Sequence, residues 1–224
     1  MLHPAIMHKE DYYTGESIAR TAAAMAAELP RNPRAAAFQP ARAALLVVDM
    51  QEYFLRQESH AFLPAAPAII PNVRMLAAAF RRAARPVFLT RHANSALDAG
   101  QMAAWWRELP TRDHPLAAID ASLPAPEDAV IAKTQYDAFY QTDLESRLKR
   151  AGSEQVVITG VASHLCCEST ARSAFVRGFA VFVAIDGTAT WNRQLHLASL
   201  RALSHACAVP LLASELLAAL AKAS

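Results

Sequence analysis

Three side chains capable of covalent chemistry follow short apolar runs in this sequence. Asp49 comes at the end of the run 43–50, Lys133 follows the run 129–132, and Cys166 lies shortly after the run 156–158. A thiol can attack a carbonyl carbon, a carboxylate can take up and return its proton, and an ammonium group stabilises both negative charges. These residue types predict nucleophilic catalysis if the fold brings them together.

The residues around Cys166 predict that a helix begins there. The run 156–158 has the apolar, β-branched character of a buried strand, residues 159–160 end it, and Ser163 is placed to cap the following helix. A thiol in the first turn meets unpaired N–H groups and the positive end of the helix dipole, which stabilise a thiolate and can hold an oxyanion. The alternative is that Cys166 is a small buried core residue.

Two neighbours of this thiol carry expectations of their own. Cys167 is rotated about 100° from Cys166 along a helix and is expected to face the core. His164 lies two residues before the thiol, and we expect it to make a helix-start contact and not to act as the base of a Cys–His pair.

Strand-like and helix-like runs alternate along the body of the chain. This alternation predicts an α/β fold, a Rossmann-like open six-stranded parallel sheet with helices on both faces. In such sheets sites form outside the carboxyl ends of the strands, which is where Asp49, Lys133 and Cys166 fall. The expected strands are 43–50, 86–90, 129–132, 156–158, 179–186 and 208–212, and the expected helices are 66–85, 142–151, 163–178, 193–205 and 214–222. Thr142 and Glu145 have the spacing of a capping box.

The chain divides into an arm and one domain. Residues 1–42 predict an N-terminal arm, with a short alanine-rich helix over 16–28 and a proline-rich connector over 29–42. Residues 43–224 predict a single domain. Within it, the segment 93–127 is long and irregular, which is typical of a substrate-covering segment or an interface.

Composition narrows the class of protein. The chain has 224 residues, of which 54% are hydrophobic and 19% charged, with a formal net charge of +2, so it is globular and nucleic-acid binding is not expected. No apolar run approaches the ~20 residues that span a bilayer, so we expect no membrane association. The three cysteines and the first ten residues show neither a disulfide framework nor a signal peptide, which favours a reduced, cytoplasmic protein.

Three segments resemble the signature blocks of the isochorismatase-like hydrolase superfamily. They are LLVVDMQEYF at 45–54, AKTQYDAF at 132–139 and TGVASHLC at 159–166, in the family's order and spacing. The resemblance covers roughly residues 29–217. It implies that Asp49, Lys133 and Cys166 form a catalytic triad, which the family uses for C–N hydrolysis through an acyl-cysteine.

The same resemblance implies further site residues. A cis peptide bond between Val161 and Ala162 is expected to turn the N–H groups of Ala162 and Cys166 toward a common point as an oxyanion hole. The expected substrate-binding residues are Gln51, which orients the acid, Phe54, which walls the pocket, Tyr136 and Phe139, which line it, and His92, which hydrogen-bonds the substrate. The alternatives are that the rings of Tyr136 and Phe139 belong to the core and that His92 is a surface residue.

No metal or other cofactor is expected. Nicotinamidases of this superfamily bind a metal through an Asp-x-His pair and a further His after the second strand, whereas that exit here reads TRHAN at 90–94. The expected partner is a small-molecule substrate, and relatives form homodimers or homotetramers, which we also expect here.

A second resemblance leads to an alternative activity. Residues 28–46 are similar to the start of true isochorismatases of siderophore and phenazine pathways, which cleave the vinyl ether of isochorismate to 2,3-dihydro-2,3-dihydroxybenzoate and pyruvate without a thiol. Those enzymes have a tyrosine in place of Ala162, a glycine in place of Cys166 and a glutamine near His92.

Chemistry is decided by the site and not by the surrounding fold. We therefore predict a cysteine hydrolase that acts on a small amide or ureido-type substrate. An isochorismatase in which Asp49 protonates the vinyl ether, and a non-catalytic assembly partner that uses the fold and the arm, are the alternatives.

Overall fold

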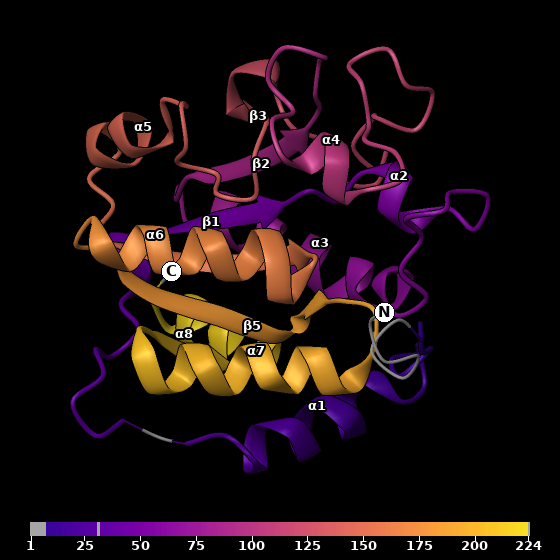
Figure 1. The fold of residues 1–224 in the computed structure, drawn as a ribbon. Helices are drawn as coiled ribbons and strands as arrows, with labels where there is room; N and C mark the ends of the chain where they lie inside the picture. The colour runs from indigo at the N-terminus through magenta and orange to yellow at the C-terminus, as the bar shows by residue number, and fades with distance from the viewer. Residues whose placement is uncertain (1–7, 31, 224) are drawn as a thin grey trace.

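The six strands form one parallel sheet in the computed structural model, which describes residues 8–30 and 32–223. The sheet order is β3-β2-β1-β4-β5-β6 (Figure 1). The strands are β1 (Ala43–Val48), β2 (Val87–His92), β3 (Val130–Lys133), β4 (Gln155–Val161), β5 (Ala180–Ala189) and β6 (Ala208–Leu211). The predicted α/β fold with six parallel strands is confirmed.

The central strands are apolar because both of their faces are covered. Every residue of β1 and of β4 is buried. Helices pack on both faces of such a sheet, so its strands read as continuous apolar runs without a polar alternation. This is why the sequence shows β1 and β4 as short uninterrupted runs.

The helices lie in two layers. α3 (Ala66–Arg82) contacts four strands and runs beside α8 (Ala213–Ala223), whereas α6 (Glu168–Val176) and α7 (Arg193–Ala206) contact each other on the opposite face (Figure 1). The other helical segments are α1 (Ile18–Ala27), α2 (Glu52–Leu55), α4 (Met102–Trp105) and α5 (Leu144–Arg150), the 3₁₀ turns η2 (Pro40–Arg42) and η3 (Glu127–Ala129), and the π-helical turn η4 (Ser163–Cys167). The chain moves out along β1, β2 and β3 and then returns to the other side of β1 with β4.

At two predicted element ends, other contacts replace the local pattern. Residues 159–160 do not end β4, which continues to Val161 beside the carboxyl end of β1. The capping box at Thr142 does not form, because α5 begins at Leu144 and the Thr142 hydroxyl donates to the carbonyl of Ala138. In both cases a contact with a distant or preceding segment replaces the local pattern.

Gly160 explains how β4 passes the end of β1. Its φ is +104°, and a Cβ atom added there would lie 2.0 Å from the carbonyl oxygen of Val48. Only glycine permits so close a backbone approach with a positive φ. The close approach brings the carboxyl ends of β1 and β4 together immediately before Asp49.

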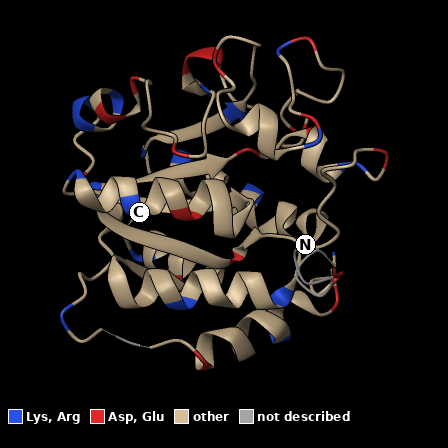
Figure 2. Ribbon diagram, in the orientation of Figure 1, with Lys and Arg blue, Asp and Glu red and all other residues tan. Residues whose placement is uncertain are grey.

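The predicted arm packs on the domain, and charged residues lie on the surface. Residues 8–30 and 32–42 contain α1 and η2 and lie against the domain, while residues 1–7, 31 and 224 of the predicted arm and domain lie outside the described residues. Charged residues of both signs are scattered over the described part of the chain (Figure 2). Within that part, no helix is both long and apolar enough to cross a membrane.

Candidate active site

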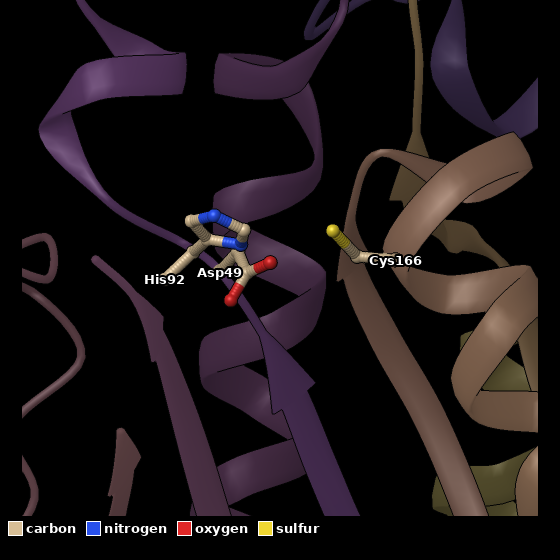
Figure 3. Close-up of side chains that lie close together, drawn as sticks. All are labelled: Asp49, His92 and Cys166. Carbon is tan, nitrogen blue, oxygen red and sulfur yellow. The ribbon is translucent and has the colours of Figure 1, made fainter. Parts of the chain in front are cut away.

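The site lies where the strand order reverses, between β1 and β4. Asp49 directly follows β1, Lys133 ends β3, and Cys166 lies in η4 after β4. In open parallel sheets the crevice at this switch point is the usual place for a ligand. Figure 3 shows Asp49 with His92 beside it and Cys166 facing both from the neighbouring strand and turn.

Asp49 is held in an unusual backbone conformation. Its φ is +49°, in the left-handed region that few residues other than glycine adopt. The Thr90 hydroxyl donates to Asp49 Oδ1 at 2.5 Å, and the Asp49 N–H donates to Thr90 Oγ1 at 3.0 Å. Thr90 on β2 therefore fixes one carboxylate oxygen and leaves Oδ2 directed toward the other site residues.

Lys133 links the acid to the thiol. Its Nζ lies 2.7 Å from Asp49 Oδ2 and 3.4 Å from Cys166 Sγ, and it donates to the carbonyl of Gln135 at 2.9 Å. Burial by itself lowers the pKa of Lys133, but the interactions of its ammonium group with Asp49 and Cys166 outweigh burial and raise that pKa. The ammonium form is therefore favoured inside the protein.

His92 is buried next to this ammonium group and is not a surface residue. Asn94 uses its amide N–H groups on Asp98 Oδ1 and the carbonyl of Thr134, so its Oδ1 accepts a hydrogen bond from His92 Nε2 at 2.7 Å. His92 Nδ1 then accepts from Lys133 Nζ at 3.2 Å. Burial, followed by the charge of Lys133, lowers the pKa of His92 to about 4, so the ring is neutral.

The surroundings of Cys166 favour the protonated thiol, whereas the sequence led us to expect a helix-stabilised thiolate. Burial raises its pKa to about 12, with Lys133 lowering it and Asp49 raising it. The side chain is only 6% exposed, so desolvation of the thiolate outweighs the turn's N–H groups. A proton acceptor is therefore needed before the sulfur can attack, and Asp49 is the adjacent acid residue.

The turn that carries Cys166 is π-helical. The N–H groups of Leu165 and Cys167 both donate to the carbonyl of Ala162, at 3.0 and 3.2 Å. The peptide bond between Val161 and Ala162 is cis, as the resemblance implies. The expectation that Ala162 and Cys166 supply an oxyanion hole stays a prediction.

The predictions for the neighbours of the thiol fare differently. Ser163 is not an N-cap, because η4 begins directly after Ala162 and the buried Ser163 Oγ has no hydrogen-bond partner among the described residues. His164 makes no helix-start contact, and its Nδ1 lies 2.5 Å from Thr190 Oγ1. Cys167 does face the core, where it is 1% exposed.

An aromatic cluster borders the site. Trp106 Nε1 donates to the Tyr136 hydroxyl at 2.7 Å, and the Trp106 ring meets Trp191 at a centroid separation of 5.5 Å. Trp191 also lies 5.5 Å from the ring of His164. Burial raises the pKa of Tyr136, and the nearby Cys166 raises it further. Tyr136 was predicted to line the pocket, whereas the contributions of Trp106 and Trp191 were missed.

Trp191 was missed because the predicted fifth strand ended at residue 186. The structure continues β5 to Ala189, which places Trp191 near the strand exit. An aromatic residue just after a strand exit was the available signal.

Gln51 has its amide fully occupied by backbone groups. Its Nε2 donates to the carbonyls of His92 and Ala117, at 3.0 and 2.9 Å, and its Oε1 accepts the His92 N–H at 2.8 Å. These bonds join the ends of β1 and β2 to the segment 93–127. A role in holding the strand ends follows directly, and direct substrate binding stays a prediction.

Phe54 and Phe139 differ in their surroundings. Phe54 is half-buried and packs edge-on to Tyr53 at 5.2 Å. Phe139 is buried and stacks on Phe179 at 6.1 Å, with the guanidinium of Arg177 4.9 Å from its ring centroid. The substrate-binding role predicted for Phe139 gains no support from these contacts.

The donor atoms of the site do not fit a metal ion. Asp49, His92 and Cys166 each offer a ligand atom, and these atoms lie within 4.8 Å of one another. Lys133 Nζ is within 3.4 Å of the same three side chains and already supplies the positive charge. A metal ion there would face the repulsion of a buried ammonium group.

Known proteins share this arrangement of sequence and fold. The isochorismatase domain family matches residues 43–215. This chain belongs to the isochorismatase-like hydrolases. Family membership makes it an isochorismatase-family hydrolase, and the close placement of Asp49, Lys133 and Cys166 is consistent with an Asp–Lys–Cys triad.

The similar isochorismatase-like proteins have different activities in their names. Nicotinamidase 3 of Arabidopsis thaliana is 38% identical over 164 residues, which cover 70% of this chain and 78% of that protein. Enterobactin synthase component B of Escherichia coli (strain K12) is 33% identical over 177 residues, which cover 78% of this chain but only 62% of that protein. A cysteine hydrolase structure from Pseudomonas syringae pv. phaseolicola 1448A has the same fold, with a TM-score of 0.80 at 22% identity, over 88% of this chain and 98% of that one.

Proposed function

We propose that this hydrolase cleaves the C–N bond of a small amide or ureido-type substrate through an acyl-cysteine. The observation that carries the proposal is the position of Cys166 Sγ, 3.4 Å from Lys133 Nζ, beside an acid that is itself paired with the same ammonium. A thiol, a base and a buried cation within contact distance are the parts that nucleophilic acyl transfer needs.

The reaction proceeds in two halves. Asp49 takes the Cys166 proton as the sulfur attacks the substrate carbonyl, and the oxyanion is held by the N–H groups of Ala162 and Cys166. The C–N bond then breaks, and the protonated Asp49 gives its proton to the departing nitrogen. Water, deprotonated by Asp49, attacks the thioester and releases the acid, and the proton on Asp49 returns to the sulfur. Lys133 stabilises the negative charge as it moves between carboxylate and sulfur.

The test uses two adjacent cysteines that differ in their surroundings. With a panel of small primary amides and ureido compounds, Cys166→Ala is expected to lower kcat/KM by at least about a thousandfold. Cys167→Ala, which removes an equally buried thiol that faces the core, is expected to retain activity. Intact-mass measurement after rapid quenching should show an acyl adduct on the wild type and on Cys167→Ala, and none on Cys166→Ala. Equal activity of the two variants would contradict the proposal.

Isochorismate hydrolysis is the second candidate, and the similarity to the isochorismatase of Bacillus subtilis (strain 168) favours it. In that reaction Asp49 protonates the vinyl ether and the thiol is not required. Isochorismate turnover that survives Cys166→Ala, without amide turnover by the wild type, would support this candidate against the first.

A further inference from the structure

The N-terminal arm holds the segment that carries Trp191. The Glu10 N–H donates to the Trp191 carbonyl at 2.7 Å, and the Glu10 carboxylate accepts the Arg193 N–H at 3.1 Å. Asn192 Nδ2 donates to the carbonyl of His8 at 3.1 Å. Three consecutive residues after β5 therefore depend on the arm for their hydrogen bonds.

Tyr12 extends this attachment into a buried network. Thr188 donates its hydroxyl to the Ala184 carbonyl, so Thr188 Oγ1 accepts from His196 Nε2 at 3.1 Å. Burial lowers the pKa of His196 to about 3, so the ring is neutral and its Nδ1 accepts from the Tyr12 hydroxyl at 3.0 Å. The same hydroxyl accepts the Thr190 N–H at 3.0 Å. The Tyr12 hydroxyl oxygen therefore hydrogen-bonds both His196 Nδ1 and the Thr190 N–H. Without it, both groups would be buried without a hydrogen-bond partner.

The network ends at η4, the turn that carries Cys166. Thr190, whose N–H is held by Tyr12, contacts His164 through its side chain at 2.5 Å. His164 belongs to η4, two residues before the nucleophile, and its ring lies 5.5 Å from that of Trp191. The arm therefore contacts the aromatic cluster and the nucleophile turn through one short segment of β5 and its exit.

We propose that Glu10 and Tyr12 are positioning residues that seat Trp191 against Trp106 and His164 as a wall of the acyl pocket, so that the arm sets substrate affinity. This inference rests on the proposed function, since a wall has meaning only for a substrate acylated at Cys166. Neither Glu10 nor Tyr12 touches the triad, so the arm acts on KM more than on the chemical step.

The arm is anchored at its other end as well. Lys9 Nζ donates to the carbonyls of His60 and Phe62, at 2.6 and 2.7 Å, in the segment that follows α2. This second anchor lies on the far side of Glu10 from Tyr12 along the chain. Residues 8–12 therefore form a strap between two loops and are held at both ends.

The kinetic experiment compares Tyr12→Phe with two controls. Tyr12→Phe leaves the Thr190 N–H and His196 Nδ1 without a partner, and we expect KM to rise about tenfold while kcat changes by less than about threefold. Tyr140→Phe, on an exposed tyrosine away from the arm, is expected to leave both constants unchanged. Glu10→Ala should raise KM in the same way, and Glu10→Gln, which keeps a side-chain acceptor for the Arg193 N–H, should restore it.

A second readout reports the geometry without any substrate. The edge-to-face pair of Trp106 and Trp191 should produce an exciton couplet in circular dichroism, and Trp106→Phe identifies it by its loss. We expect the couplet to weaken in Tyr12→Phe and Glu10→Ala and to persist in Tyr140→Phe and Glu10→Gln.

The two readouts separate the ways in which the inference can fail. An unchanged couplet in Tyr12→Phe and Glu10→Ala overturns the positioning of Trp191 by the arm. A weakened couplet with unchanged KM overturns the role of Trp191 as a substrate wall. A wild-type chain that turns over no amide defeats the proposed function alone, because the couplet still decides whether the arm positions Trp191.

Discussion

At the scale of single residues, the ammonium group of Lys133 controls the site. An ammonium has three N–H donors, yet four acceptor atoms surround Nζ, on Asp49, His92, Gln135 and Cys166. One acceptor is therefore always without a full hydrogen bond. Movement of the thiol proton to Asp49 removes negative charge from one acceptor and creates it on the sulfur, so the donors can shift to the thiolate without any movement of the chain.

Because Lys133 forms a buried ion pair with Asp49, we expect Lys133→Met to be strongly destabilising. Both side chains are fully buried, so the substitution leaves the Asp49 carboxylate charged and without its cation. We expect the free energy of unfolding to fall by about 3–5 kcal/mol and amide hydrolysis to be lost. Urea unfolding is the measurement. The double variant Asp49→Asn/Lys133→Met removes both charges and should recover most of the lost stability, and a double variant no more stable than Lys133→Met would contradict this account.

At the scale of elements, β4 and its turn deliver the nucleophile. β4 runs beside β1 in parallel register up to the pair Val48 and Gly160. Asp49 directly follows β1 at this point, and the cis peptide bond that precedes η4 comes at the end of β4. The approach of the two backbones at this pair determines how far Cys166 stands from the acid. The site therefore depends on the ends of the strands as much as on the side chains they carry.

Gly160→Ala is expected to disturb both stability and activity. The added Cβ would lie 2.0 Å from the Val48 carbonyl oxygen, so β1 or β4 must shift, and we expect a loss of more than about 3 kcal/mol in the free energy of unfolding and a lower kcat. Gly152→Ala is the matched control: its φ is also positive, at +63°, but the added atom meets nothing within 4 Å. That control should cost only about 1 kcal/mol and leave kcat unchanged. Equal losses would mean that φ, and not the close approach, decides the effect.

At the scale of the whole molecule, three buried or partly buried histidines link different parts of the fold, and burial favours their neutral form. Burial lowers the pKa of His92 and of His164 to about 4 and that of His196 to about 3, from an ordinary value of 6.5. They join elements far apart in the chain, since His196 alone connects the arm, β5 and α7.

These histidines predict a loss of stability in weak acid. A lowered pKa means that the unfolded chain binds protons first, so the stability is fully present above pH 6.5 and is lost as the pH falls toward the folded values of about 4 and 3. Between pH 7 and pH 5 we expect the free energy of unfolding to fall by about 1–2 kcal/mol for each of His92 and His196. Urea unfolding across this range is the measurement. His196→Asn should flatten the slope, whereas His205→Asn, on the exposed side of α7, should leave it unchanged. A wild-type stability that is level from pH 7 to pH 5 would refute the prediction.

Local sequence patterns are enough to predict the layers of the fold and the three candidate catalytic residues. Apolar runs and their periodicity are local properties, so they predicted six strands and the intervening helices, and they placed Asp49, Lys133 and Cys166 at strand exits. A parallel sheet then brings such exits to one edge whatever the details of packing. The resemblance in three short motifs added the cis peptide bond that the structure contains.

The protonation states in the site, and the residues that surround it, depend on contacts between distant segments. The protonated state of Cys166 depends on burial by every neighbouring element, which a helix-start pattern does not contain. The neutral tautomer of His92 follows from Asn94 and Lys133 acting on its two nitrogens, and Trp191 is held by a hydrogen bond from Glu10 in the distant N-terminal arm. Desolvation and long-range hydrogen bonds depend on contacts between segments that are distant in the chain. A local sequence pattern does not contain those contacts.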